Sequence, residues 1–150
     1  MKPSTLLDES KIVLNIDSAT PKAEIIARLV RLAVGSEGDS DPIIEDLLER
    51  EARMTTGIGQ GVALPHTRSA TLPKAVGALG ISREGVDFSA IDEEPVYIIF
   101  AFVTPESEPT LHIQTLAATA SLFGSSEVRE AVRTVATPAE ALEVIRSHET

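Results

Sequence analysis

An uninterrupted apolar segment in the second half of the chain limits the folds open to it. Val96–Val103 reads Val-Tyr-Ile-Ile-Phe-Ala-Phe-Val. Its β-branched and aromatic residues favour an extended strand. A strand with one solvated face would alternate apolar and polar residues, whereas this segment is apolar on both faces. It therefore predicts a central strand that is covered on both sides by other elements.

Further elements are predicted on either side of this segment. Ile12–Ile16, Val62–Pro65 and Ala75–Ile81 are expected to be extended. Apolar residues at helical spacing predict five helices. The first follows the N-cap Thr20 and ends at Gly35, the second runs from Asp41 to about Arg53, and the third follows the cap Thr110 and ends at Gly124. The fourth follows Ser125 or Ser126, and the fifth begins with a capping box at Thr137–Glu140. Helices before, between and after strands predict an α/β (α+β) sandwich, a mixed β-sheet flanked by helices on both faces.

Composition restricts the classes of function. The 150 residues (residues 1–150) are expected to form a single domain, and 43% hydrophobic residues can build an aliphatic core. A net charge of −10 argues against binding to nucleic acid or to an anionic membrane. The sequence has no cysteine, which excludes disulfides and thiolate metal sites. With no signal peptide and no long apolar run, we expect a cytoplasmic protein without stable membrane insertion.

A glycine-rich segment, Thr55–His66, leads to a histidine that could act as a nucleophile near neutral pH. Its three glycines are expected to remove bulk around the ring and to leave backbone N–H groups for an anion. Pro65 fixes the backbone just before the ring. A backbone carbonyl that holds one ring nitrogen would leave the other free to attack. The alternative is a structural histidine that ends a strand and bonds to a loop.

Two further residues suit a site for an anion. His112 is expected in the first turn of a helix, where the helix dipole lowers its pKa and favours a bound anion; the alternative is a polar surface residue near a cap. Arg50, near the end of the second helix, could direct its guanidinium to a phosphoryl group or complement the helix C-terminus. Arg68 could add positive potential near His66, and His148 is expected to be solvated.

Other catalytic motifs fit poorly. Gly57-x-Gly59-x-Gly61 precedes a strand, whereas the dinucleotide fingerprint precedes a helix, and the chain has no P-loop. No serine stands on a nucleophile elbow. A zinc site would need His66, His112 and a carboxylate to converge, for which the spacing gives no signature. We therefore expect no cofactor and no metal.

Several segments together carry a family resemblance. They are Leu47–Glu51, Thr56–His66, Gly85–Phe88 with Ile91-Asp92, and Leu111–Ala117. In this order they closely resemble the signature of type 2 EIIA domains of the phosphoenolpyruvate-dependent phosphotransferase system (PTS). Those domains include the fructose and mannitol EIIA proteins and their nitrogen-regulatory relatives. The resemblance covers the chain from about Leu6 to the last predicted helix.

The resemblance implies a phosphohistidine carrier and phosphotransferase component. His66 would accept a phosphoryl group from HPr, the small phosphocarrier protein, and pass it to a IIB domain, usually to a cysteine. His112 would be the second active-site histidine, and Arg50 the active-site arginine. The alternative is a regulatory binding module that controls partner proteins by its phosphorylation state, with no onward transfer to a sugar. The chain carries no IIB or IIC segment, which slightly favours a regulatory role.

Two positions depart from the family pattern. Thr67 follows the histidine where the family usually has Gly or Ala, and Pro109-Thr110-Leu111 is an unusual approach to His112. Neither change removes a catalytic group. The β-branched Thr67 is expected to narrow the access of a partner to His66.

Overall fold

The fold is built on one mixed sheet, seen in a computed structural model that describes residues 1–149. Its strands are β1 (Ile12–Val13), β2 (Gly57–Gly59), β3 (Val62–Ala63), β4 (His66–Ser69), β5 (Val76–Val86) and β6 (Val96–Pro105). Their order is β1-β5-β6-β3-β2, and β4 also pairs with β6. β5 runs antiparallel to β6, whereas β3 and β4 run parallel to it along its other edge.

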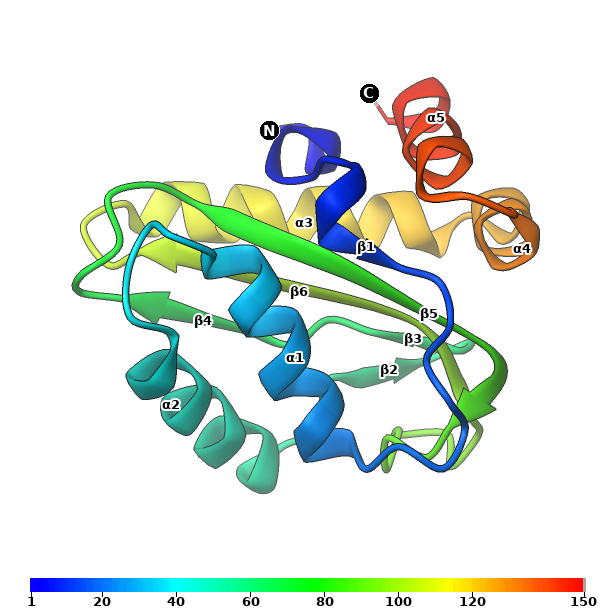
Figure 1. Cartoon of the computed structure of the whole chain (residues 1–150), viewed down its shortest axis with the longest axis horizontal. Coiled ribbons are helices and arrows are strands. Elements are labelled where there is room, and N and C mark those ends of the chain that lie inside the picture. Colours follow the sequence, from blue (N-terminus) through cyan, green and yellow to red (C-terminus); the bar gives the residue numbers. More distant parts are fainter. Residues whose placement is uncertain (150) are drawn as a thin grey trace.

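Helices cover both faces of this sheet (Figure 1). The chain opens with two 3-10 turns, η1 (Pro3–Leu6) and η2 (Glu9–Lys11). One face carries α1 (Lys22–Val34) and α2 (Ser40–Arg53), and the other carries α3 (Pro109–Gly124), α4 (Ser126–Thr134) and α5 (Pro138–His148). A separate apolar core lies on each side of the sheet. The predicted mixed sheet with helices on both faces is confirmed.

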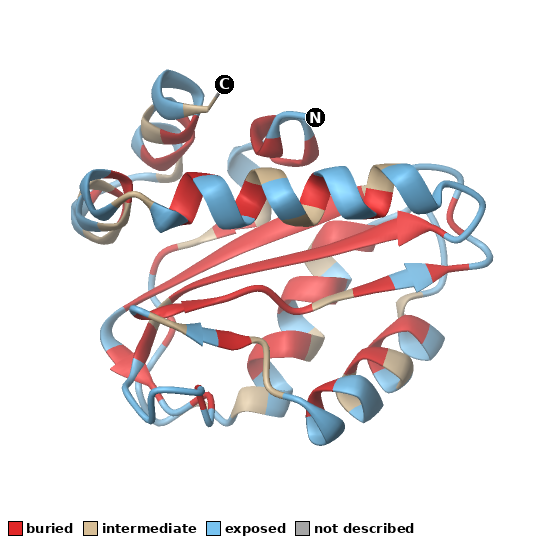
Figure 2. Ribbon diagram, turned by 180° about the vertical axis from the view of Figure 1, so that it is seen from behind, coloured by how far each residue is buried: buried red, intermediate tan, exposed pale blue. Residues whose placement is uncertain are grey.

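β6 is the central strand that the apolar segment predicted. All of its residues are buried except Tyr97, which is half-buried, and Figure 2 shows β5 and β6 buried along most of their length. Ile99 packs into the core beneath α1 and α2, while Phe100 packs into the opposite core. This alternation follows from the two-residue period of a strand and explains why both faces had to be apolar.

The starts of three helices differ by one or two residues from the prediction. α1 begins after Pro21 and not after Thr20. α2 begins at Ser40 because the Asp39 carboxylate accepts the backbone N–H of Asp41. α3 begins at Pro109, whose missing N–H costs nothing at the first helical position.

Most of the predicted helix ends and caps are confirmed. Gly35 terminates α1 with φ of 52°, and α2 ends at Arg53. Ser125 accepts the N–H of Val128, and Thr137 accepts that of Glu140. The Glu140 carboxylate accepts from Ala136 and not from Thr137, so the predicted capping box is only half formed.

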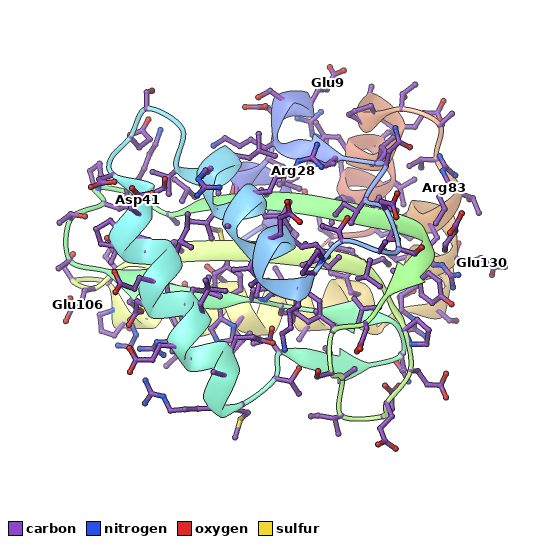
Figure 3. All side chains as sticks on the ribbon, turned by 60° about the horizontal axis from the view of Figure 1, so that its bottom comes forward. Glu9, Arg28, Asp41, Arg83, Glu106 and Glu130 are labelled. Carbon is purple, nitrogen blue, oxygen red and sulfur yellow. The ribbon has the colours of Figure 1, made fainter. Side chains whose placement is uncertain are left out.

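Most charged side chains lie on the outside, as the six labelled residues of Figure 3 illustrate; each of these six residues is exposed. Within residues 1–149, no helix has both the length and the apolar character needed to cross a membrane.

Candidate active site

The candidate nucleophile lies where the strand pairing along β6 is interrupted. β3 and β4 both pair with the same edge of β6, and Leu64-Pro65 separates them. The Phe102 N–H donates to the Pro65 carbonyl at 3.0 Å, which carries the pairing across the break. His66 is therefore the first residue of β4, opposite Phe102. It does not end the preceding extended segment, because pairing with β6 resumes directly after Pro65.

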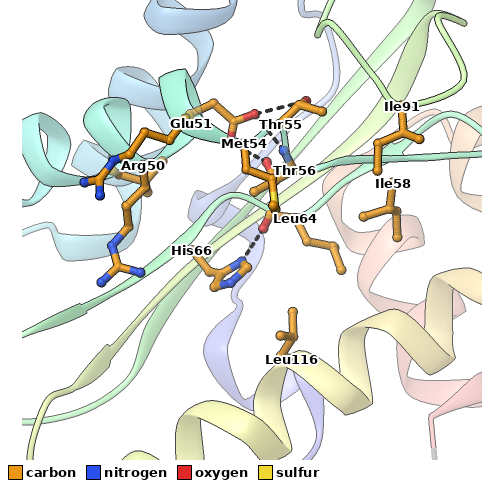
Figure 4. Close-up of a pocket in the computed structure, with 12 residues that line it drawn as sticks. Arg50, Glu51, Met54, Thr55, Thr56, Ile58, Leu64, His66, Ile91 and Leu116 are labelled. Carbon is orange, nitrogen blue, oxygen red and sulfur yellow. Dashed lines mark hydrogen bonds between the residues drawn. The ribbon is translucent and has the colours of Figure 1, made fainter.

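One hydrogen bond fixes the ring of His66. Its Nδ1 lies 2.6 Å from the Leu64 carbonyl oxygen, the contact drawn in Figure 4. A carbonyl only accepts, so Nδ1 is the donor and carries the proton. In the neutral ring, Nε2 then keeps the lone pair. The predicted arrangement, in which a backbone carbonyl orients one nitrogen and leaves the other available, is present.

The structure brings the two candidate histidines together. The ring of His66 stacks on Phe102, with centroids 5.2 Å apart and an interplanar angle of 9°. The ring of His112 lies 5.3 Å from that of His66. His112 projects from the first turn of α3, as predicted, and is only 8% exposed. Both histidines therefore contribute to one site between β4 and α3.

Burial keeps His112 neutral. Its pKa falls from 6.5 to about 4, chiefly because burial disfavours the charged imidazolium, and further because positive charge at His66, Arg68 and Arg50 repels it. The expected direction is confirmed, although burial is the leading cause rather than the helix dipole. Its Nδ1 lies 2.7 Å from the Thr104 hydroxyl on β6. At neutral pH the site thus holds an uncharged, oriented imidazole beside His66.

Arg50 and His66 line the same cavity, of about 460 Å³ (Figure 4). Arg50 stands on the last turn of α2, and its side chain is 53% exposed. Its Nε lies 3.4 Å from a carboxylate oxygen of Asp46, one turn earlier in the helix. His112 adjoins His66 without lining the cavity. All three residues predicted from the sequence therefore lie at one site, at the edge of the sheet.

Apolar side chains form most of the remaining wall. The apolar residues that line the cavity are Leu47, Met54, Ile58, Leu64, Ile91 and Leu116. Three of them are unusually exposed for their type: Met54 at 76%, Ile58 at 49% and Ile91 at 72%. We call these three residues the apolar rim. Exposed apolar side chains gathered around one polar site are typical of a surface that contacts another molecule.

The glycines before His66 serve a hairpin. Positive φ angles of 97°, 59° and 79° occur at Gly59, Gln60 and Gly61. A type I′ turn needs positive φ at both of its central residues, and here that turn joins β2 to β3. Hydrogen bonds to protein atoms also occupy two backbone N–H groups here, Gly57 to the Thr55 hydroxyl and Gln60 to the Asp92 carboxylate. The expectation that this segment presents free N–H groups to an anion is therefore wrong at these two positions.

The same glycines allow close packing. A Cβ on Gly57 would lie 2.8 Å from Ala90, and one on Gly61 would lie 2.9 Å from the Tyr97 ring. The Ile91 N–H donates to the Gly57 carbonyl at 3.0 Å, which brings Ile58 and Ile91 to the same cavity. Gly57 is needed for the close approach to Ala90, before β6, and Gly61 for the close approach to Tyr97, within β6. The expectation that the glycines remove bulk around the His66 ring is therefore wrong.

Thr67 does not narrow the access to His66. It is fully buried, and its hydroxyl donates to the Asp46 carboxylate on α2. Neighbouring residues of a strand point to opposite faces, so Thr67 faces away from the His66 ring. The prediction of a narrowed entrance is wrong for this reason.

Four other residues at the site could not be recognised from the sequence, for two reasons. Phe102 stacks on His66 through the parallel register of β4 on β6, and Thr104 contacts His112 because α3 packs against β6; neither contact leaves a local signal. Asp46 and Glu51 resemble ordinary charged residues of a solvated helix. Glu51 is in fact 7% exposed, and its carboxylate accepts the Thr56 N–H at 2.8 Å.

The candidate site contains no set of side chains that suits a metal ion. Within residues 1–149, no group of three or more His, Asp or Glu side chains is placed to hold a metal ion. The two histidines converge, but no carboxylate completes the set that a zinc site would need.

Known proteins resemble this chain over nearly its whole length. The family model for the phosphoenolpyruvate-dependent sugar phosphotransferase system, EIIA 2, matches residues 5–148. The fructose-specific EIIA component of Haloferax volcanii is 36% identical, over 85% of this chain and 83% of that protein. The nitrogen regulatory protein of Pseudomonas aeruginosa is 32% identical, over 91% and 89%. The chain spans only 24% of the Bacillus subtilis fructose-specific EIIABC component, to which it is 29% identical.

Solved structures agree with this assignment. The nitrogen regulatory protein IIA-Ntr of Neisseria meningitidis has a TM-score of 0.86 and 33% identity, over 95% of this chain and 97% of that one. Enzyme IIA mannitol of Escherichia coli, solved in complex with phosphorylated enzyme IIB mannitol, shares the fold with a TM-score of 0.77 and 21% identity, over 94% and 97%. The chain therefore belongs to the EIIA type 2 family of the phosphoenolpyruvate-dependent sugar phosphotransferase system.

Proposed function

We propose that this protein carries a phosphoryl group on Nε2 of His66, received from an HPr-type phosphocarrier protein. The observation that supports this most directly is the bond from Nδ1 to the Leu64 carbonyl, which leaves the Nε2 lone pair for attack. Nε2 forms a bond to phosphorus while the bond between phosphorus and the donor's histidine nitrogen breaks. The donor nitrogen keeps that electron pair. The Leu64 carbonyl keeps the ring in place throughout.

Arg50 and His112 are proposed to bind the phosphoryl oxygens. A guanidinium offers planar, paired donors that match a phosphoryl group. His112 is neutral at physiological pH, and a Thr104 hydroxyl that donates to its Nδ1 leaves the ring proton on Nε2 as a donor. One cation and one neutral donor stabilise the transferring group without holding it too tightly to leave. Phosphoryl transfer requires mainly such positioning and charge stabilisation.

The apolar rim is proposed to receive the partner proteins. Its three side chains are exposed and line the same cavity as His66 and Arg50. Contact with a partner would exclude water from the site, which strengthens the electrostatic interactions inside. The related IIA mannitol protein was solved with a phosphorylated IIB protein. We therefore propose a IIB domain, or a regulatory target protein, as the acceptor at the same face.

A second use of the site has support from the relatives. The nitrogen regulatory proteins and the fructose EIIA component resemble this chain to a similar degree, at 32% and 36% identity. In the regulatory alternative, the phosphorylation state of His66 controls binding to a partner without onward transfer to a sugar. An experiment with a labelled phosphoryl group on His66 distinguishes the two functions. A carrier would transfer the labelled group to a IIB acceptor, whereas a regulatory protein would keep it.

The central test is the gain of mass in a mixture of phosphoenolpyruvate, Enzyme I and HPr. The wild-type protein is expected to gain one phosphoryl group, and His66→Ala none. His148→Ala serves as the matched control, because His148 lies at the end of α5, and it should gain the group normally. Phosphorylation of His66→Ala to the wild-type extent would refute the assignment.

A further inference from the structure

Three residues on two elements are linked by contacts to a single carboxylate. The hydroxyl of Thr67, on β4, donates to Oδ2 of Asp46, on α2. The same oxygen lies 3.4 Å from Nε of Arg50, one helical turn further along. We propose that this Thr67–Asp46–Arg50 network positions the Arg50 guanidinium for the phosphoryl group, an inference that rests on His66 being the phosphoryl acceptor.

Thr67 is the fixed end of the network. Its side chain is fully buried, and each residue of β4 is paired with β6. Branching at Cβ restricts the rotamers of Thr67 further. Asp46 and Arg50, in contrast, have side chains 47% and 53% exposed. An exposed ion pair between neighbouring turns of a helix orders its side chains only weakly. The buried hydroxyl supplies the constraint that the pair alone lacks.

The network also determines which donors of Arg50 stay available. A guanidinium has five N–H donors. Contact through Nε uses the side nearest the helix and leaves the terminal nitrogens for another ligand. Arg50 lines the cavity with His66, whereas Asp46 does not. The carboxylate therefore holds Arg50 from outside the cavity and does not occupy the place of the phosphoryl group.

The same strand thus orients both partners of the phosphoryl group. Successive residues of a strand face opposite ways, so His66 points toward α3 while Thr67 points toward α2. Thr67 contacts Asp46, Asp46 contacts Arg50, and Arg50 lines the same cavity as His66. A glycine or alanine at position 67 has no hydroxyl and could not make this link. Thr67 and Asp46 are positioning residues, since both act through Arg50.

The test is a set of matched variants whose phosphoryl acceptance from phosphorylated HPr is followed by rapid quench. Thr67→Val replaces the hydroxyl by a methyl group of similar size and should lower kcat about tenfold, equivalent to about 1.4 kcal/mol in the barrier, with KM changed less than twofold. Thr67→Ser should restore the wild-type rate. In an Arg50→Gln background, Thr67→Val should cause no further loss, because the network has nothing left to position. Glu45→Gln, an exposed carboxylate of the same helix, is the control and should match wild type.

A second measurement does not depend on phosphoryl transfer. The Nε–H group of Arg50, followed by ¹⁵N relaxation, should be ordered in the wild type and mobile in Thr67→Val and Asp46→Asn. If Thr67→Val does not fold, Asp46→Asn and Thr67→Ser allow the same comparisons. Wild-type protein that takes no phosphoryl group, yet shows an ordered Arg50, would refute the proposed function and leave the network standing.

Three results would overturn the network. One is that Thr67→Val lowers kcat for phosphoryl acceptance by the same factor in the wild-type and in the Arg50→Gln background. Another is faster acceptance by Asp46→Asn, which would mean that Asp46 restrains Arg50 from the phosphoryl group. The third is an Arg50 side chain that is equally mobile in all variants.

Discussion

The two histidines of the site differ in the hydrogen bonds that orient them. His66 Nδ1 faces a carbonyl oxygen, which accepts only, whereas His112 Nδ1 faces the Thr104 hydroxyl, which can donate. His66 thereby keeps a lone pair on Nε2. His112 is buried and neutral, so it can offer a proton from the opposite nitrogen. Two residues of one type therefore suit two different tasks, as the acceptor and as a donor.

The depressed pKa of His112 has a measurable effect on stability. Between pH 6.5 and about 4 the unfolded chain binds a proton at this residue that the folded protein rejects. The free energy of unfolding therefore falls as pH is lowered through this window, and above it the group has no effect. We expect wild type to lose on the order of 2 kcal/mol relative to His112→Gln between pH 7.5 and 4.5. Urea unfolding of both proteins across this range provides the measurement.

The carboxylates titrate in both proteins, so their effect on the free energy of unfolding cancels in this comparison. If the difference in stability between the two stayed constant with pH, His112 would not be a buried neutral base. Its proposed role as a neutral donor would then lose its physical basis.

Individual site residues could be predicted only where the sequence marks them. His66 and His112 lie within recognisable segments, and Arg50 has a spacing that the family resemblance picks out. Thr104 could not be found, because its contact with His112 depends on how α3 packs against β6, which tertiary structure sets. Thr67 was noticed as unusual, but its direction was misjudged, since local sequence does not fix which face of a short edge strand is buried.

At the scale of elements, a buried ion pair joins α1, α2 and the turn before β2. The Glu51 carboxylate lies 2.7 Å from Nζ of Lys22 and accepts two hydrogen bonds from Thr56, both at 2.8 Å. Lys22 Nζ also donates to the Phe88 carbonyl at 2.9 Å. These contacts fix the end of α2, which carries Arg50, relative to the hairpin that leads to His66.

Breaking this pair should cost far more than breaking its exposed counterpart on the same helix. The Glu51 side chain is 4% exposed, whereas Glu49 and Arg53 form a pair that is 70% exposed on both sides. Glu51→Gln leaves a partly buried ammonium uncompensated and should lower the free energy of unfolding by about 2–4 kcal/mol. Glu49→Gln should lower it by no more than about 0.5 kcal/mol. Urea unfolding with an unchanged m-value measures both, and equal losses would show that burial of Glu51 contributes nothing.

Long elements were easier to predict than short ones. The helices and the two long strands carry enough periodic or continuous apolar residues to identify them, with errors of one or two residues at the helix starts. β1 spans only two residues because the paired stretch is shorter than the β-branched run suggests. The inward face of α3 is partly polar: it buries His112, Thr115 and Thr119 beside Leu122 and Phe123. The two threonine hydroxyls donate to backbone carbonyls of their own helix, which makes their burial possible.

Considered as a whole, the molecule combines a strongly acidic composition with an uncharged apolar rim at its candidate active site. The net charge is −10, yet the exposed residues that line the His66 cavity are the apolar Met54, Ile58 and Ile91 and the cationic Arg50 and Arg53. The net charge would act on partners at a distance, whereas the rim and the two arginines would act in contact. A partner that reaches His66 must cover this rim, which gives the rim an effect on recognition separable from the chemistry.

A charge placed on the rim should weaken recognition without weakening the fold. Ile91 is 72% exposed, so Ile91→Asp should change the free energy of unfolding by less than about 0.5 kcal/mol. The same change would leave a carboxylate desolvated beneath a docked partner, and kcat/KM for phosphoryl acceptance from HPr should fall about tenfold, mainly through KM. Ala139→Asp adds the same charge to an exposed position on α5, across the sheet from α2, and should leave KM within twofold of wild type. If both variants raised KM equally, the effect would come from net charge alone, and the rim would not be a contact surface. A rise confined to Ile91→Asp, with kcat preserved, would place the partner directly over the cavity that His66 and Arg50 share.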